Sequence, residues 1–340
     1  MTMISRGDPV RIVVIGCGLI GRKRLEAIER LENATVAATI DPVRERAADS
    51  RAPHYRSLSE LTPQSYDAAV IAVPHDAAPD LTEAILAAGK PVLVEKPLAT
   101  SPAAARKLEK LADKLPSPSF VGYNYRFLPA VREALRIAAD GRLGRLRSVD
   151  MLIGHGGHPE SGKGWKLDPM RAGGGVLLDP GVHLLDLLLQ VAPAASCTGL
   201  EATRGFWESG IEEDVAATFR TEMLLVTLRV SHIRWINTFR IEMFGEDAYC
   251  IAEGRGGNYG PMILRFGKRW GWANGRGVTQ RESEEVWHFG AADLSLRDEL
   301  AEVTHSWRTG QVADHNFHPA TFAEARAVIE LLDELYARLR

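Results

Sequence analysis

The sequence predicts an α/β protein with an N-terminal, doubly wound parallel sheet and a C-terminal α/β domain built on a large, mostly antiparallel sheet. Three observations support this fold class. An apolar strand near the N-terminus runs into a glycine turn and a helix, strands and helices then alternate to about residue 121, and after residue 122 several strands follow one another without helices. With 340 residues the chain is long enough for two domains. We expect one domain over residues 1–122 and a second over residues 123–340.

The first element is the strand and turn at residues 11–21, RIVVIGCGLIG. Its glycines are spaced G-x-G-x-x-G between an apolar run and a helical pattern. Gly16 permits a tight turn, Gly18 lets the backbone approach phosphates, and Gly21 lets the helix pack closely on the strand. A pyrophosphate then binds the free N–H groups at the helix N-terminus. The pattern predicts a dinucleotide site at Gly16, Cys17, Gly18, Leu19, Ile20 and Gly21.

The second strand ends at an acidic residue. The run Thr35–Ile40 precedes Asp41, which lies twenty positions after Gly21. An acid here accepts hydrogen bonds from the adenosine ribose and repels a 2′-phosphate, so NAD is favoured over NADP. Two alternatives stay open: Asp41 merely starts a turn with Pro42, or Arg44 and Arg46 support NADP.

Five strands and four helices are expected in the first domain, including the two strands described above. The expected strands are Ile12–Ile15, Val36–Ile40, Ala68–Val73, Val92–Val94 and Ser119–Val121. The expected helices are Ile20–Leu31, Val43–Ala48, Ala78–Ala88 and Pro102–Lys114, the last capped by Ser101. This alternation predicts a parallel sheet covered on both faces.

The second domain opens with a helix at Pro129–Ala139 and continues mainly with strands. We expect an apolar helix at Pro180–Val191 and a final helix at Pro319–Leu339. Gly-rich loops at 154–164 and 254–277 are candidates for lining a pocket. The expected strands are Leu146–Ile153, Val215–Arg220, Leu224–Val230, Phe239–Phe244 and Ala248–Ala252.

Composition restricts the possible partners. Hydrophobic residues make up 45% of the chain, charged residues 25%, and the net charge is −3, so nucleic acid is not an expected partner. Cys17, Cys197 and Cys250 form neither a metal spacing nor an even disulfide set, which favours reduced thiols in a cytoplasm. Neither a signal peptide nor a membrane span is evident.

Lys96 ends the strand in PVLVEKP. Ligands of doubly wound sheets bind beyond the carboxyl ends of the strands, so this ammonium group is a candidate for catalysis. Pro97 restricts the backbone of Lys96 to extended conformations. An ordinary exposed lysine is the alternative.

A second candidate pair lies in GGGVLLDPGVHLLDLLL. Pro180 marks a helix start with Asp179 at the N-cap, and His183 follows on the same face. The helix dipole lowers the pKa of His183 and the Asp179 carboxylate raises it, which suits a general base near neutral pH. The alternative is a capping aspartate and a core histidine. Asp186, three positions after His183, is a further candidate that either supports the imidazole or faces another strand.

Polar and aromatic residues nearby suit a polyhydroxylated ligand. The candidates for substrate contact are Tyr123, Arg126, Trp165 and Lys166, with solvated loop positions as the alternative. His155 and His158 have no acidic or cysteine partners at metal-ligand spacing, so no metal is expected.

Together these segments resemble the glucose-fructose oxidoreductase/inositol dehydrogenase family, often written Gfo/Idh/MocA. The similarity lies in GCGLIG at 16–21, Asp41-Pro42, AGKPVLVEKPLA at 88–99, GGGVLLDPGVHLLDLL at 173–188, and Glu212–Asp214. E-K-P paired with D-x-x-x-H behind the glycine fingerprint is more specific than any single motif.

The resemblance implies an N-terminal Rossmann domain and a C-terminal domain whose outer sheet face forms dimers or tetramers. It implies that Lys96, Asp179 and His183 are catalytic and that the Lys96–Pro97 bond is cis. The expected cofactor site also includes Val73, Pro74, His75, Glu95 and Lys96.

The chain departs from the family at two places. Arg24 replaces a frequent histidine, and Ala78 stands where P-N-x-x-H has its histidine, so His75 is expected to take over part of the cofactor contact. These changes affect the packing around the nicotinamide rather than the reaction class.

The expected function is NAD(P)-dependent hydride transfer to or from a carbinol or keto carbon of a sugar, cyclitol or sugar derivative. Three alternatives remain: a ketoreductase for a nucleotide-linked or antibiotic sugar, an NAD-dependent glycosidase with transient oxidation, and an NAD-responsive regulatory protein. The expected partners are a small sugar or polyol and further copies of the chain, without nucleic acid or membrane.

Overall fold

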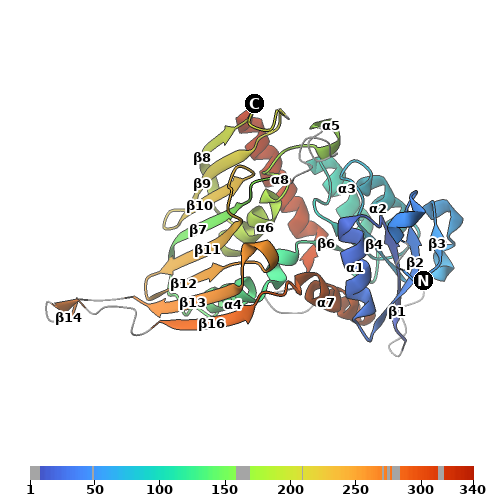
Figure 1. Cartoon of the computed structure of the whole chain (residues 1–340), viewed down its shortest axis with the longest axis horizontal. Coiled ribbons are helices and arrows are strands. Elements are labelled where there is room, and N and C mark those ends of the chain that lie inside the picture. The colour runs from blue at the N-terminus through green and yellow to red at the C-terminus, as the bar shows by residue number, and fades with distance from the viewer. Residues whose placement is uncertain are drawn as a thin grey trace. The chain divides into compact units, whose positions relative to one another are not determined.

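A computed structural model describes residues 8–47, 50–157, 169–208, 210–269, 272–273, 276–277, 284–312 and 318–340. The chain divides into two compact units. Unit 1 comprises Met1–Asn124, Met170–Gly173 and Leu294–Asp333, and unit 2 comprises Tyr125–Pro169, Gly174–Asp293 and Glu334–Arg340. Figure 1 gives the element labels used below.

Unit 1 is built on a seven-stranded sheet with the order β17-β6-β5-β4-β1-β2-β3. Strands β1 to β6 are parallel, and β17 joins β6 antiparallel. The order of the six parallel strands is that of a doubly wound dinucleotide-binding sheet. The strands are β1 Val10–Ile15, β2 Ala34–Ile40, β3 His54–Tyr55, β4 Ala68–Ile71, β5 Val92–Glu95, β6 Phe120–Gly122 and β17 Ala320–Thr321. The expected fold class is confirmed.

The helices of unit 1 follow the expected alternation. They are α1 Leu19–Glu29, α2 Ala78–Ala87, α3 Pro102–Ala112, the short α5 Pro169–Ala172 and α7 Ser295–Thr309. The predicted cap of α3 is present, since the Ser101 hydroxyl accepts from the N–H of Ala104 at 3.3 Å. The helix expected over 43–48 is instead a 3₁₀ turn at Arg44–Ala47.

Helix α7 was not anticipated, and it changes the domain boundaries. Its Leu300, Val303 and Trp307 are at most 1% exposed and belong to the same apolar core as β1 and α1. Residues 294–333 therefore belong to unit 1, whereas the sequence predicts them in the second domain.

The last helix begins later than expected. Ala320 and Thr321 pair with β6, and α8 spans Phe322–Leu339. The Glu324 carboxylate accepts from the backbone N–H of Thr321 at 2.9 Å, and the Thr321 hydroxyl accepts from the N–H of Glu324 at 3.3 Å, so this pair fixes the helix start.

Unit 2 is built on an eight-stranded sheet with the order β16-β13-β12-β11-β7-β10-β9-β8. Only β7 and β10 pair in parallel, as part of an otherwise antiparallel sheet. Helices α4 and α6 pack on one face of it (Figure 1). The strands are β7 Leu146–Gly154, β8 Ser196–Thr203, β9 Asp214–Arg220, β10 Leu225–Ser231, β11 Thr238–Gly245, β12 Ala248–Glu253, β13 Met262–Lys268 and β16 Glu285–Gly290; the helices are α4 Pro129–Ala139 and α6 Gly181–Val191, and β14 Trp272–Ala273 pairs with β15 Arg276–Gly277.

The other face of this sheet is polar. Ion pairs cross neighbouring strands, as between Arg229 and Asp214 at 2.6 Å and between Arg240 and Glu253 at 2.9 Å. A hollow of about 540 Å³ lies among β7 to β11 on the same face. Across the described part of the chain, no helix combines the length and apolar character needed to cross a bilayer.

Candidate active site

The glycine turn of unit 1 has the geometry that a dinucleotide pyrophosphate requires. Gly16 has φ +89°, and an added Cβ there would lie 2.3 Å from the carbonyl oxygen of Ala72. A Cβ at Gly21 would lie 1.8 Å from the Gly16 carbonyl oxygen, whereas one at Gly18 would meet nothing within 4 Å. Two glycines therefore let the backbone segments touch, and the middle one leaves open space beside the turn.

Helix α1 starts directly behind this turn. Gly18 is its N-cap, no side chain caps it, and its first turn contains no acidic residue. The first N–H groups of such a helix have no intrahelical acceptor, so they can receive an anion. The turn residues therefore fit the pyrophosphate that the sequence predicted for them.

Asp41 contacts the turn directly. Its carboxylate is 3% exposed and accepts from the N–H groups of Cys17 and Val43, both at 2.8 Å. Asp41 therefore both starts a local turn and lies against the glycine loop. A carboxylate has about four acceptor positions, so capacity remains for ribose hydroxyls. Burial and the neighbouring Asp41 charge raise the pKa of the Cys17 thiol to about 11.

The residues after β4 border the same turn. A Cβ at Gly16 would lie 2.8 Å from Cγ1 of Val73. His75 is 7% exposed, and its Nδ1 lies 3.0 Å from the carbonyl oxygen of Ala172 in α5. One ring nitrogen is thus directed at the protein backbone, and a cofactor contact by His75 stays a prediction.

Lys96 follows β5 and is partly buried, and the Lys96–Pro97 bond is cis, as the resemblance implied. The preceding Glu95 accepts from Nε of Arg24 at 2.7 Å. Arg24 is fully buried and also donates to Glu299 of α7 at 2.6 Å.

Arg24, Glu95 and Glu299 form a charged triad in the interior of unit 1. Burial alone would lower the pKa of the Arg24 guanidinium, but Glu95 and Glu299 together raise it above its ordinary value. Gly122 makes room, since a Cβ there would lie 2.8 Å from Nη2 of Arg24. The triad ties α1, α7 and the strand end before Lys96 together.

In unit 2, a buried carboxylate shapes the glycine turn before Asp179. Glu212 accepts from the N–H groups of Gly175 at 2.9 Å and Leu177 at 3.2 Å, and from the Tyr336 hydroxyl at 2.6 Å. A Cβ at Gly174 would lie 2.1 Å from the Tyr336 oxygen. Glu212 and Tyr336 therefore hold the segment that leads to Asp179, a role the sequence did not reveal.

The predicted N-cap role of Asp179 is wrong. Helix α6 begins at Gly181, its cap residue is Pro180, and no side chain caps it. The Asp179–Pro180 bond is cis, and Gly181 donates to the Val176 carbonyl at 2.8 Å, so the backbone turn closes the helix start. Asp179 is partly buried in this turn, one residue outside the cap position.

His183 is buried in α6 against an aromatic ring. Its imidazole stacks on Tyr125 with centroids 3.8 Å apart and planes 8° from parallel. Arg255 donates to the Tyr125 hydroxyl, and its guanidinium lies 4.3 Å from the ring centroid of Tyr259. Arg255 and Tyr259 were not predicted individually as site residues, although both come from the Gly-rich loop expected to line a pocket.

Two predicted substrate contacts have other surroundings. Arg126 is 2% exposed and forms a two-bond ion pair with Asp186, at 2.8 and 2.5 Å, so its guanidinium is committed inside unit 2. Asp186 is therefore the ion-pair partner of Arg126, and a substrate contact by Arg126 stays a prediction. Tyr123 is fully buried in unit 1. Trp165 and Lys166 lie outside the described residues.

Comparison with known proteins defines the class as an oxidoreductase with an NAD-binding Rossmann domain. A family model of that description matches residues 10–123. A model of the GFO/IDH/MocA C-terminal domain matches residues 131–250. The chain belongs to this Gfo/Idh/MocA oxidoreductase family, so the expected family, fold and cofactor class are confirmed.

Similar proteins agree with this assignment. A myo-inositol dehydrogenase from Streptomyces leeuwenhoekii is 31% identical over 181 residues, which cover 52% of this chain and 54% of that protein. The match thus spans about half the length of this curated relative.

Solved structures extend the likeness in fold to nearly the whole chain. A 3-ketoreductase from Actinomadura kijaniata in complex with NADP and TDP-benzene has TM-score 0.79 at 17% identity and covers 97% of this chain and 98% of that one. The WlbA dehydrogenase from Bordetella pertussis in complex with NADH and UDP-GlcNAcA has TM-score 0.78 at 18% identity, covering 98% and 96%.

Proposed function

We propose that this protein is an NAD(P)-dependent oxidoreductase acting on a carbinol or keto carbon of a sugar, cyclitol or sugar derivative. The observation that carries the proposal is the glycine turn, closed by backbone contacts at Gly16 and Gly21 and open at Gly18. When bound, the nicotinamide supplies the two-electron oxidant or reductant. The E-K-P and D-x-x-x-H motifs of the family support a redox role.

The chain's own residues have distinct tasks in this proposal. His183 accepts the hydroxyl proton on an imidazole nitrogen during oxidation and returns it during reduction. The Lys96 ammonium stabilises the negative charge that develops on the substrate oxygen. Asp179 orients the substrate or the imidazole.

NAD is the proposed cofactor in preference to NADP. Asp41 is buried against the loop and brings negative charge to the end of β2, where a 2′-phosphate would be repelled. Arg46 weakens this preference, because its guanidinium lies 3.7 Å from the Asp41 carboxylate. The two similar solved structures described above hold NADP and NADH, respectively.

A cyclitol or free sugar is the proposed substrate class. The similarity to a myo-inositol dehydrogenase favours this class. A nucleotide-linked sugar is the second candidate, because both similar solved structures contain a nucleoside diphosphate derivative.

We also propose that the polar face of the eight-stranded sheet joins copies of the chain. The residues that line the hollow include Arg229, Arg234 and Arg240 as well as Asp150 and Glu242. Such a mixture of charges can be complementary to itself across a two-fold axis. The cytoplasmic location expected from the cysteines stays a prediction.

Substitution of the proposed catalytic residues tests the function. Lys96→Ala and His183→Ala are each expected to lower turnover about 100-fold or more, because each removes a group that acts in the transition state. Turnover is measured with a panel of inositols, sugars and nucleotide sugars. The dissociation constant for NAD should stay within a few-fold of the wild-type value in both variants. Wild-type turnover in both variants would refute the assignment, and absence of steady NADH formation with every substrate would favour the glycosidase or regulatory alternatives.

A further inference from the structure

The stacked pair of Tyr125 and His183 restricts how the imidazole can turn. The two rings are 2% and 4% exposed, and they lie face to face at 3.8 Å. Phe239 of β11 packs edge-on against Tyr125, with centroids 5.5 Å apart and planes at 87°. Rotation of the imidazole would break the face-to-face contact, and displacement of Tyr125 would break the contact with Phe239.

Arg255 fixes the position of Tyr125 from the far end of its ring. It donates to the hydroxyl oxygen, and its guanidinium carbon lies 4.9 Å from the Tyr125 centroid and 4.3 Å from the Tyr259 centroid. The glycines on either side, Gly254 at φ +76° and Gly256 at φ +79°, give the backbone a conformation that side chains disfavour. The loop sequence is therefore adapted to place Arg255 over these two rings.

The surroundings of Tyr125 keep its phenol neutral, so its role differs from that of a proton acceptor. Burial raises the pKa of the phenol, Asp179 and Asp293 raise it further, and Arg255 opposes them in part. The phenol of Tyr125 is consequently neutral near neutral pH. Its aromatic face, and not its ionisation, is what it offers to His183.

We propose that Tyr125 is a positioning residue for His183 and that Arg255 holds Tyr125 in place. The proposal rests on the proposed function, in which His183 is the general base. A base must reach its proton within hydrogen-bond distance, and a shift of about 1 Å can lower a rate on the order of 100-fold. A ring held on one face by Tyr125 keeps its nitrogen directed at one position.

Two substitutions of Tyr125 separate the ring from the hydroxyl. Tyr125→Phe keeps the stacked face, and its kcat is expected to stay within about 3-fold of wild type. Tyr125→Leu removes the face, and its kcat is expected to fall about 10-fold or more with a smaller change in KM. Tyr66→Leu is the matched control, since Tyr66 is equally 2% exposed but lies in unit 1 before β4. Equal losses in the Phe and Leu variants, or a wild-type kcat in Tyr125→Leu, would overturn the proposal.

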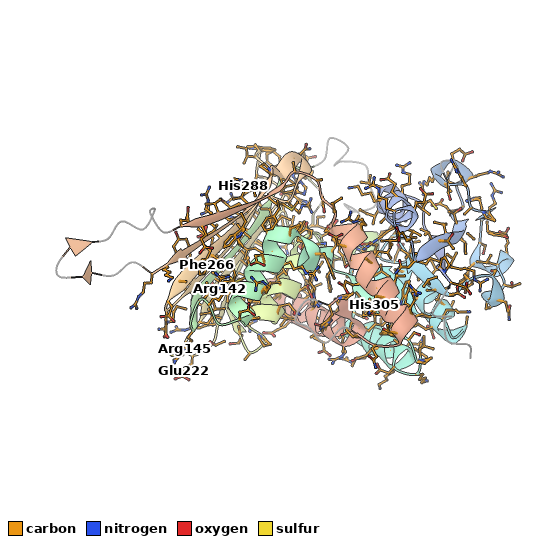
Figure 2. The ribbon with its side chains drawn as sticks, turned by 90° about the horizontal axis from the view of Figure 1, so that it is seen from below. Arg142, Arg145, Glu222, Phe266, His288 and His305 are labelled. Carbon is orange, nitrogen blue, oxygen red and sulfur yellow. The ribbon has the colours of Figure 1, made fainter. Side chains whose placement is uncertain are left out.

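Arg255→Met tests the second part of the proposal, that Arg255 holds Tyr125 in place. This test remains available even if Tyr125→Leu does not fold. We expect kcat to fall about 3-fold to 10-fold because Tyr125 loses its anchor. Arg142→Met is the matched control: Figure 2 shows Arg142 beside Phe266, with the guanidinium carbon 4.5 Å from the ring centroid. An unchanged kcat in Arg255→Met, or an equal loss in Arg142→Met, would show that Arg255 has no positioning role.

A spectroscopic readout distinguishes failure of this proposal from failure of the proposed function. The Tyr125 ring current shifts the His183 C–H resonances, which can be assigned by their absence in His183→Ala. Tyr125→Leu is expected to move these resonances towards random-coil values, while Tyr66→Leu leaves them in place. Resonances that do not move in Tyr125→Leu would refute the stack whether or not the wild type turns over a substrate.

Discussion

Nearby charges decide whether a single ionisable residue can be buried in this protein. Arg24 is an example, because its fully buried guanidinium is compensated by Glu95 on one side and Glu299 on the other. Removal of one partner from a buried ionic group typically costs about 3–5 kcal/mol, since a charge is left without compensation. The planar, always charged guanidinium of Arg24 can bind both carboxylates at once.

Asp41→Ala is the prediction at this scale. The change removes the ribose acceptor and also frees the N–H groups of Cys17 and Val43. We expect the dissociation constant for NAD to rise about 10-fold or more, in line with one or two lost hydrogen bonds to a charged group, and that for NADP to change less. Titration of intrinsic fluorescence with each dinucleotide measures both constants.

Asp67→Ala is the matched control for Asp41→Ala. Asp67 also lies in unit 1, where its carboxylate pairs with Arg11 at 2.8 Å. Its loss is expected to leave both dinucleotide constants unchanged. Equal affinity of the wild type for NAD and NADP would contradict the proposed role of Asp41.

At the scale of elements, short turns are held by side chains distant in the sequence. The turn before α6 depends on Glu212, whose carboxylate receives two backbone N–H groups and the Tyr336 hydroxyl. Burial and the Glu212 charge raise the pKa of Tyr336, so this hydroxyl remains a donor. The geometry of Asp179 and His183 is therefore linked to the C-terminal end of α8.

Glu212→Ala and Glu213→Ala form a matched pair at this scale. Both carboxylates are 3% exposed, and Glu213 also accepts two backbone N–H groups, those of Phe206 and Trp207. Each variant is expected to lose about 1–3 kcal/mol of unfolding free energy for the donors left unpaired. Only Glu212→Ala is expected to lower kcat, about 10-fold, because only Glu212 holds the turn before His183.

Thermal melts and steady-state kinetics measure these effects. Equal kcat losses in the two variants would indicate general loosening of unit 2. An unchanged kcat in Glu212→Ala would show that the turn before α6 does not affect the rate of the reaction.

At the scale of the whole molecule, the chain returns to its first unit after forming most of the second. Leu300, Val303 and Trp307 of α7 fill the core beside β1 and α1, and Trp307 donates to the Pro118 carbonyl at 2.9 Å. Burial of three such side chains contributes roughly 5–9 kcal/mol, which is comparable to the entire stability of a domain. Without α7, residues 1–124 are therefore expected to have an incomplete hydrophobic core.

A fragment of residues 1–124 is expected to lack a cooperative thermal transition. A second fragment, in which a short Gly-Ser linker joins residue 124 to residues 294–333, is expected to fold. The linker can be short because the Asn124 amide donates to the Ser295 hydroxyl at 2.7 Å. Near-UV circular dichroism during melting decides the matter, and cooperative unfolding of the 1–124 fragment would contradict the assignment of α7 to this core.

The sequence alone determined what depends on local spacing. Windows of about 20 residues are enough to read these features, because strand, turn and helix geometry repeats over such lengths. They are the glycine fingerprint, the alternation of strands and helices, the cap of α3 at Ser101 and the family motifs at Lys96 and His183.

The tertiary structure alone decided which distant residues meet. Arg24 and Glu299 are 275 positions apart, Tyr125 and Arg255 are 130 apart, and Glu212 and Tyr336 are 124 apart. Such pairs leave no periodic trace, since each forms only where folded segments bring two buried groups together. For the same reason the ion pair between Arg126 and Asp186 could not be predicted from the sequence, because it forms only in the folded unit.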